Sequence, residues 1–150
     1  MFNKNTQKRS KATRIDTLIG QYTHIKGNVS FSGGLRIDGS VAGNINATGD
    51  TKSVLTLSEK SVIEGEIRVP NLIVNGTITG NVYSSQHIEL AANAKINGTV
   101  YYRLLEMVTG CEVNGQLIHV SKDDKILSVE NDVNTNSDDA LQLENKDNLD

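Results

Sequence analysis

The chain has 150 residues, with 15 lysines and arginines against 18 aspartates and glutamates, 13 glycines, one proline, one cysteine and no tryptophan. A single cysteine excludes an intramolecular disulfide and a cysteine zinc cage, and no apolar run of about 18 residues or signal-peptide core is visible. Aromatic residues make up only 4% of the chain, so a core has to consist of valine, isoleucine and leucine, which favours strands over a helical bundle. We therefore expect one cytosolic domain of strands, flanked by tails.

Residues 1–16 form a basic segment with five lysines and arginines and one acid. An apolar pair at its start is able to enter the headgroup region of a bilayer, and each nearby basic residue adds up to about 1 kcal/mol toward an anionic leaflet. One copy would bind weakly, whereas a polymer presenting many copies would bind by avidity. We expect a disordered tail with a membrane-targeting peptide made of Met1, Phe2, Lys4, Lys8 and Arg9.

The alternative for this segment is a solvated basic tail that resembles a nucleic-acid-binding arm. The body of the chain shows no basic face with interleaved aromatic residues, which such binding would use. Nucleic acid is therefore not an expected partner.

Residues 17–120 contain a repeated unit of five residues, in which the first and last are apolar and the third is glycine. Within each unit the apolar residues and the glycine share one parity and the polar residues the other, which is the pattern of a half-buried strand. The units return after 15 to 22 residues. The glycines that mark them are Gly27, Gly43, Gly65, Gly80, Gly98 and Gly115.

Such a period predicts a coil of three short strands, and stacked coils form a parallel β-helix of about six coils. The aliphatic spacings of 2 and 4 favour the right-handed kind over the left-handed hexapeptide kind. The longest interval between these glycines, from Gly43 to Gly65, predicts an extra loop at residues 47–53. A sandwich or an up-and-down barrel is the alternative, with Asn75-Gly76 and similar pairs as hairpin turns, but alternation continues through these pairs.

The two ends of a stacked solenoid carry unpaired backbone groups and an uncovered core unless something caps them. No cap is evident in the sequence, so the ends favour pairing with another copy, either head-to-tail or head-to-head with tail-to-tail. The alternative is that the tails fold back over the ends. We expect self-association through Tyr22, Ile25, Val29 and Phe31 at the N-terminal coil, and through Val113, Leu117, Ile118 and Val120 at the C-terminal coil.

Residues 121–150 carry nine acids and three lysines, are rich in asparagine and serine, and show no sustained apolar face. This composition is typical of a disordered acidic tail. The predicted organisation is therefore a basic tail at 1–16, a β-helix at 17–120 and an acidic tail at 121–150.

The spacing of histidines, cysteine and acids gives little support for a metal site or for a catalytic nucleophile. The three histidines, His24, His87 and His119, are scattered and share no metal-ligand spacing. Cys111 has the parity of apolar positions and no visible activating partner, so we expect a small buried residue. No phosphate-cradling glycine loop precedes a helix, so we expect neither a metal nor a nucleotide nor any other cofactor.

An enzyme is the runner-up interpretation of the chain. Glu64 and Glu66 flank Gly65 with the separation of outward residues on one strand, a distance that a glycosidase could use. A hexapeptide-type acyltransferase using a histidine such as His87 is the other enzymatic alternative. Nothing visible would raise the pKa of one carboxyl, and the chain has no tryptophan as a sugar platform, so we expect no catalysis.

The run from Leu18 to Ile45, with Phe31–Leu35 and Ile37–Val41 inside it and the glycine units after it, resembles the bactofilins, bacterial polymer-forming cytoskeletal proteins. The resemblance implies a right-handed three-sided parallel β-helix between unstructured tails, which assembles without nucleotide into filaments through its terminal coils. It also implies a cytoplasmic protein, peripheral on the inner face of the membrane, that positions cell-wall or envelope proteins and influences cell shape. The start of the chain is similar to the membrane-targeting peptide of that family.

Overall fold

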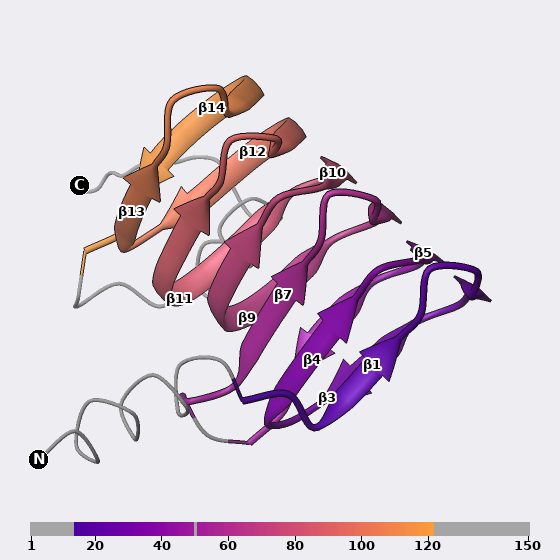
Figure 1. Cartoon of the computed structure of the whole chain (residues 1–150). Helices are drawn as coiled ribbons and strands as arrows, with labels where there is room; N and C mark the ends of the chain where they lie inside the picture. Colours follow the sequence, from indigo (N-terminus) through magenta and orange to yellow (C-terminus); the bar gives the residue numbers. More distant parts are fainter. Residues whose placement is uncertain (1–13, 50, 122–150) are drawn as a thin grey trace, which may run out of the picture. The chain divides into compact units, whose positions relative to one another are not determined.

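The computed structural model describes residues 14–49 and 51–121, and every regular element in these ranges is a strand (Figure 1). The contacts divide the chain into two units, Met1–His119 and Val120–Asp150, and all fourteen strands belong to the first. The membrane-targeting peptide and nearly all of the two predicted tails lie outside the described residues.

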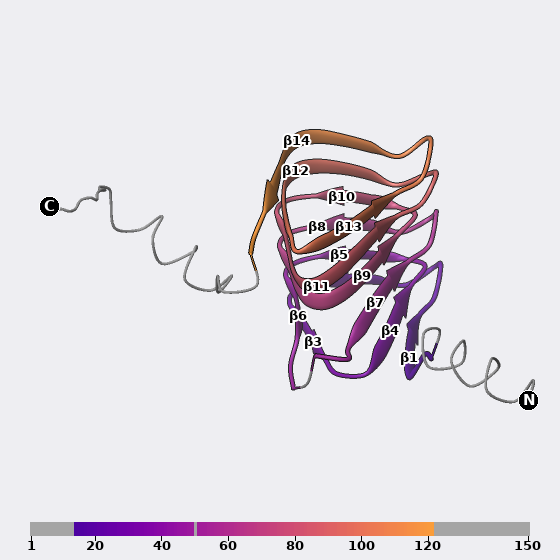
Figure 2. The same cartoon turned by 90° about the vertical axis from the view of Figure 1, so that its left-hand side faces the viewer.

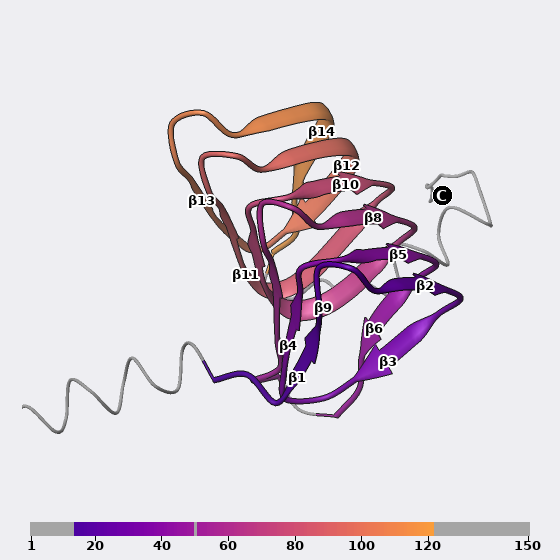
Figure 3. The ribbon, with the colours of Figure 1, turned by 45° about the vertical axis from the view of Figure 1, so that its right-hand side comes forward.

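The first unit is a three-sided parallel solenoid of six coils. Each coil passes over face 1, face 2 and face 3 in that order, and each strand pairs in parallel with the strand at the same place in the next coil. Seen from the side, the coils lie one above another from indigo β1 to orange β14 (Figure 2). A third view shows successive coils as nearly superposed loops (Figure 3). The predicted fold, a parallel β-helix of about six coils, is confirmed.

Each face is a stack of six strand segments, because four of the strands are long enough to cross a corner of the solenoid. Face 1 contains β1 (Thr17–Ile19), β4 (Gly34–Ile37), β7 (Val54–Leu57), the second halves of β9 (Ile67–Val74) and β11 (Val82–Leu90), and β13 (Leu104–Met107). Face 2 contains β2 (His24–Lys26), β5 (Ser40–Ala42), β8 (Val62–Glu64), β10 (Thr77–Thr79), and the first halves of β12 (Lys95–Tyr102) and β14 (Glu112–His119). Face 3 contains β3 (Val29–Phe31), β6 (Ile45–Ala47), the first halves of β9 and β11, and the second halves of β12 and β14.

The core consists of columns of aliphatic side chains that point inward from equivalent positions of successive coils. In face 2 the strand register places Ile63, Ile78 and Ile96 directly above one another, and all three are completely buried. The neighbours of such residues along each strand are outward and more exposed, which confirms the alternation inferred from the sequence. Because all strand pairs among the described residues are parallel, the sandwich and the up-and-down barrel are wrong for this chain.

A column of glycines runs through the corner between face 2 and face 3. Gly80 has a φ of +144°, and a Cβ added there would overlap the carbonyl oxygen of Gly65 in the coil before. The same relation joins Gly65 to Gly43 and Gly98 to Gly80. Glycine is required here both for the positive φ and for the close approach of two backbones. This explains the one residue that every repeat unit shares.

Asparagines beside the glycine column join neighbouring coils. The backbone N–H of Asn44 donates to the Oδ1 of Asn28 at 2.9 Å, and the N–H of Glu66 donates to the Oδ1 of Asn44 at the same distance. Two coils further on, the N–H of Thr99 donates to the Oδ1 of Asn81 at 3.1 Å. These bonds satisfy backbone N–H groups near the corner, where the chain turns away from the hydrogen bonds between parallel strands.

Candidate self-association surfaces

The N-terminal end of the solenoid presents the first residues of the core columns. Ile25, Val29 and Phe31 are partly buried and pack against the coil above them. Nothing among the described residues covers their other side, because they belong to the first coil. We define the N-terminal end surface as the inward-facing residues of the first coil, namely Thr17, Ile19, Ile25, Val29 and Phe31, of which Ile19 is the most buried at 8% exposed.

The C-terminal end presents the last residues of the same columns. Met107 continues the column of Leu90 and is 47% exposed, and Leu117 continues the column of Val100 and is 41% exposed. We define the C-terminal end surface as Leu105, Met107, Val113, Leu117 and His119.

Five of the eight predicted self-association residues lie in these end surfaces, and three do not. Tyr22 is 86% exposed, in the turn between β1 and β2, and belongs to no core column. Ile118 points outward from face 3, since its neighbour Leu117 points inward. Val120 is only 5% exposed and lies in the second unit, so the expectation that it would be exposed is wrong.

The end surfaces also include five residues that the sequence analysis did not assign to them, namely Thr17, Ile19, Leu105, Met107 and His119. Leu105 and Met107 form an apolar pair on face 1, in register with Ile88 and Leu90 of the coil before. Similar pairs recur in the other coils of this face, such as Leu55 and Leu57, and this second periodic series is the signal that would have found Leu105 and Met107. Ile19 occupies the equivalent position in the first coil, where Thr17 replaces its apolar partner.

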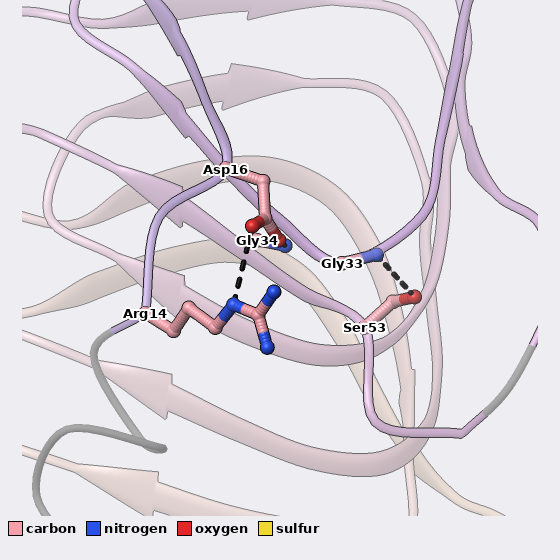
Figure 4. Close-up of polar contacts among 5 residues, drawn as sticks. All are labelled: Arg14, Asp16, Gly33, Gly34 and Ser53. Atoms are coloured by element: carbon pink, nitrogen blue, oxygen red, sulfur yellow. Dashed lines mark hydrogen bonds and ion pairs between the residues drawn. The ribbon is translucent and has the colours of Figure 1, made fainter.

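The first coil is tied to the second by a carboxylate on face 1 (Figure 4). The backbone N–H of Gly34 donates to the Oδ2 of Asp16 at 2.8 Å, and the Nε of Arg14 lies 3.2 Å from the Oδ1. The bond from Gly34, supported by the charge of Arg14, lowers the pKa of Asp16 below its ordinary value. In the same region the N–H of Gly33 donates to the Oγ of Ser53 at 3.2 Å. The bond from Gly34 to Asp16 holds the start of β1, which contributes Thr17 and Ile19 to the N-terminal end surface, against the second coil.

Aromatic side chains stack along the outside of face 3. The rings of Tyr83 and Tyr101 are parallel, with centroids 4.6 Å apart, and the guanidinium of Arg68 lies 3.9 Å from the centroid of Tyr83. Burial raises the pKa of the Tyr83 phenol, and the nearby carboxylate of Glu66 adds to the shift. The stack joins three successive coils through side chains, in addition to the backbone ladder.

The residues of the enzymatic alternative do not form a site. Glu64 ends β8, whereas Glu66 follows the corner made by Gly65, so the two carboxylates do not share a strand face as predicted. Glu66 is paired with Arg68 at 3.3 Å. The positive φ of Gly65 is the reason, since it turns the chain between them.

The remaining candidate residues are also dispersed. His87 lies outward on face 1 with its Nε2 3.4 Å from Glu106, and His24 shares a 2.6 Å hydrogen bond with Ser40 on face 2. Cys111 is partly buried and packs against the core. Among residues 14–49 and 51–121, no three histidines, cysteines or acids lie close enough to hold a metal ion.

Comparison with protein families gives a direct match to this architecture. The family model described as "Bactofilin: Polymer-forming cytoskeletal" matches residues 17–118, from the first strand to the last. The chain belongs to the bactofilin family. No helix in the described part of this bactofilin is long and apolar enough to cross a membrane.

Two curated relatives come from Myxococcus xanthus strain DK1622. Bactofilin BacO is 28% identical over 102 residues, which are 68% of this chain and 78% of BacO. Bactofilin BacP is 23% identical over 109 residues, 72% of this chain and 44% of BacP, so the chain spans less than half of BacP.

A solved structure shares the fold. The cryo-EM reconstruction of Thermus thermophilus bactofilin double helical filaments superposes with a TM-score of 0.57 at 24% identity, and the match covers 69% of this chain and 99% of that one. The likeness supports the solenoid fold of this bactofilin.

Proposed function

We propose that this bactofilin is a structural scaffold that assembles into filaments, without nucleotide, through contacts between the end surfaces of its solenoid. The observation that carries the proposal is that fully buried aliphatic columns end in less buried apolar residues. Met107 and Leu117 are exposed at the C-terminal end, and Ile25, Val29 and Phe31 are only partly buried at the N-terminal end. Covering a column end removes apolar area from water at about 25 cal/mol per Å² and gives the edge strands backbone partners. The polymer-forming character of the family supports it.

A charge placed in the C-terminal end surface is expected to abolish filaments. Leu117→Arg would place a guanidinium in the contact, with no opposite charge among the five residues of that end surface. We expect large species to disappear from sedimentation runs and from negative-stain electron micrographs, in buffer without nucleotide or metal. Phe31→Arg at the other end should act in the same way.

Ile118→Arg is the matched control, since the same substitution one residue away points outward from face 3. It should leave filaments intact, and circular dichroism should show native strand content in all variants. Filaments of normal abundance in Leu117→Arg would contradict assembly through the ends.

We further propose that the filaments lie on the inner face of the cytoplasmic membrane and position cell-wall or envelope proteins, thereby influencing cell shape. The support is the apolar pair Met1 and Phe2 beside a basic run, which lies outside the described residues. Deleting residues 1–8 should reduce co-sedimentation with vesicles containing anionic lipid at least tenfold, because every copy loses its anchor, while filaments persist. Unchanged vesicle binding would contradict the role of this segment.

A further inference from the structure

Three asparagines of the chain are followed directly by glycine, namely Asn75, Asn97 and Asn114, and none of them belongs to the end surfaces. An asparagine before glycine can lose its side-chain amide without an enzyme, because glycine has no Cβ to hinder attack by its own backbone nitrogen on the preceding side chain. The attack needs a backbone N–H that is free of an acceptor, and a strand that opens far enough for the Cγ to reach the nitrogen. The three pairs differ in both respects.

Asn75 lies in the turn between β9 and β10 and is held by the coils on both sides. Its backbone N–H donates to the carbonyl oxygen of Leu57 at 2.8 Å in the coil before, and its Oδ1 accepts from the N–H of Asn93 at 2.9 Å in the coil after. Gly76 is buried, and a Cβ placed on it would overlap Ser61. This pair is therefore fixed within the stack.

Asn97 lies in the fifth coil, which also has a coil on either side. Its carbonyl oxygen accepts a hydrogen bond from the N–H of Gly80 at 3.0 Å, and its Oδ1 accepts from the Nδ2 of Asn114 at 2.9 Å. Gly98 is in register with Gly115 in the parallel pairing of β12 with β14. Opening this pair therefore requires the fifth and sixth coils to separate.

Asn114 lies in the sixth coil, the last of the stack (Figure 2). The corner glycines of the first four coils donate their N–H to the coil that follows, as Gly65 does to the carbonyl oxygen of Thr79 at 3.0 Å. Gly115 occupies the same corner, but no coil follows it among the described residues. Its N–H therefore lacks the acceptor that the other coils supply, and β14 is paired on one side only, so it opens more readily.

We propose that Asn114 is a site of spontaneous deamidation in free protomers and that assembly protects it. The nitrogen of Gly115 gives its proton to solvent and forms a bond to the Cγ of Asn114, while the Cγ–Nδ2 bond breaks and the amide nitrogen takes up a proton and leaves as ammonia. Water then opens the cyclic succinimide at either of its carbonyls. The net reaction consumes water, releases ammonia and leaves aspartate or isoaspartate in place of the asparagine.

The product weakens the C-terminal end of the solenoid. The Nδ2 of Asn114 donates to the Oδ1 of Asn97 at 2.9 Å and to the Oε2 of Glu112 at 3.2 Å. A carboxylate in its place donates neither bond and repels Glu112. Isoaspartate also adds a carbon to the backbone of β14, which displaces Leu117 from its register with Val100. Free protomers therefore lose their ability to assemble as they age.

The protective effect of assembly rests on the proposed filaments. A coil of a second protomer stacked on the C-terminal end would cover β14 and bring acceptors to the N–H of Gly115, as the following coil does for Gly65. It would also suppress the local opening that the reaction needs. This holds whichever end of the second protomer makes the contact.

Peptide mapping by mass spectrometry tests the site in the full chain. Leu117→Arg and Phe31→Arg, both expected to stay unassembled, are incubated at mildly alkaline pH, and the replacement of NH2 by OH is followed at each asparagine. We expect Asn114 to react at least about fivefold faster than Asn97 or Asn75, the factor that one net hydrogen bond supplies. Because Phe31 lies in the first coil, the result in that variant does not depend on a change near Asn114.

Two further conditions separate the effect of structure from that of sequence. In denaturant the three asparagines should react at rates within about threefold of one another, since the folded stack no longer protects any of them. In pelleted wild-type filaments Asn114 should react at least about fivefold more slowly than in the two variants.

The outcomes are distinct. Equal rates at Asn114 and Asn97 in the folded variants would overturn the site. Equal rates at Asn114 in filaments and in unassembled variants would overturn the protection by assembly. If the wild type forms no filament at all, the proposed function fails, whereas the comparison of Asn114 with Asn97 still decides the site.

Asn114→Asp reproduces one product and tests its consequence. It should raise the protein concentration needed for assembly at least about threefold, because two hydrogen bonds are lost beside Glu112. Gln116→Glu is the matched control, since it adds the same charge to the same coil, beside Thr99 and away from these bonds. Equal effects of the two variants would overturn the loss of assembly through Asn114.

Discussion

Replacing Gly80 with alanine is expected to lower the free energy of unfolding by about 2 to 6 kcal/mol, the sum of two costs. A backbone held at a φ of +144° costs a residue with a Cβ about 1 to 3 kcal/mol. The overlap of that Cβ with the carbonyl oxygen of Gly65 forces the coils apart and costs about 1 to 3 kcal/mol more. Denaturant unfolding in the non-assembling Leu117→Arg background measures the loss without a contribution from polymers.

Alanine substitutions at two other glycines separate the cost of the positive φ from the cost of the steric overlap. Gly27 has a φ of +130°, but an added Cβ there would meet nothing within 4 Å, because no coil lies before the first. Gly27→Ala should therefore cost only the backbone part, about 1 to 3 kcal/mol. Gly20, without a strained φ and with open space around it, should tolerate alanine. Equal losses for Gly27→Ala and Gly80→Ala would show that the close approach of the coils does not matter.

Leu72→Ala is expected to lower the free energy of unfolding by about 2 to 5 kcal/mol, because it opens a cavity in the middle of a core column. Leu72 is completely buried, with Leu55 and Ile88 as its neighbours in the adjacent coils. The end surfaces are two or more coils away, so variant protein kept below its melting temperature should still form filaments. Unfolding in the Leu117→Arg background gives the first quantity, and sedimentation of the otherwise wild-type protein gives the second.

Leu105→Ala is the matched change at the end of the same column. Leu105 is only partly buried, so its truncation should cost less stability than that of Leu72, while it should raise the protein concentration needed for assembly. If Leu72→Ala and Leu105→Ala impaired assembly equally, the end surface would have no special role.

The fold could be predicted because its two strongest constraints are visible in one sequence. Alternation predicts which side chains enter the core, and the recurrent glycine marks the corner where Gly65 and Gly80 approach the coil before them. What could not be predicted is which outward side chains lie next to one another on neighbouring coils. The coils differ in length, with a long connection after β6, so the alignment of Tyr83 with Tyr101 depends on where each corner falls.

The ends were predicted less completely than the core. Parity placed Val113 and Leu117 in core columns, which the register with Ile96 and Val100 confirms, but it could not show that Val120 is buried. It also placed Glu64 and Glu66 on one strand, because the pattern of alternating residues continues through Gly65 although the backbone turns there. A corner that preserves alternation is invisible in a sequence, and only the φ of the glycine reveals it.

The direction of the backbone hydrogen bonds also determines how the solenoid would resist tension along its axis. Each strand pairs with the strand at the same place in the next coil, so the bonds between coils run along the solenoid axis on all three faces. Tension along the axis loads the bonds of a whole coil together, and no single strand is peeled away first. The contacts between protomers have no continuous chain across them, so in the proposed filament they yield before the coils do. A stretched filament would then break into folded units whose end surfaces are intact and able to rejoin.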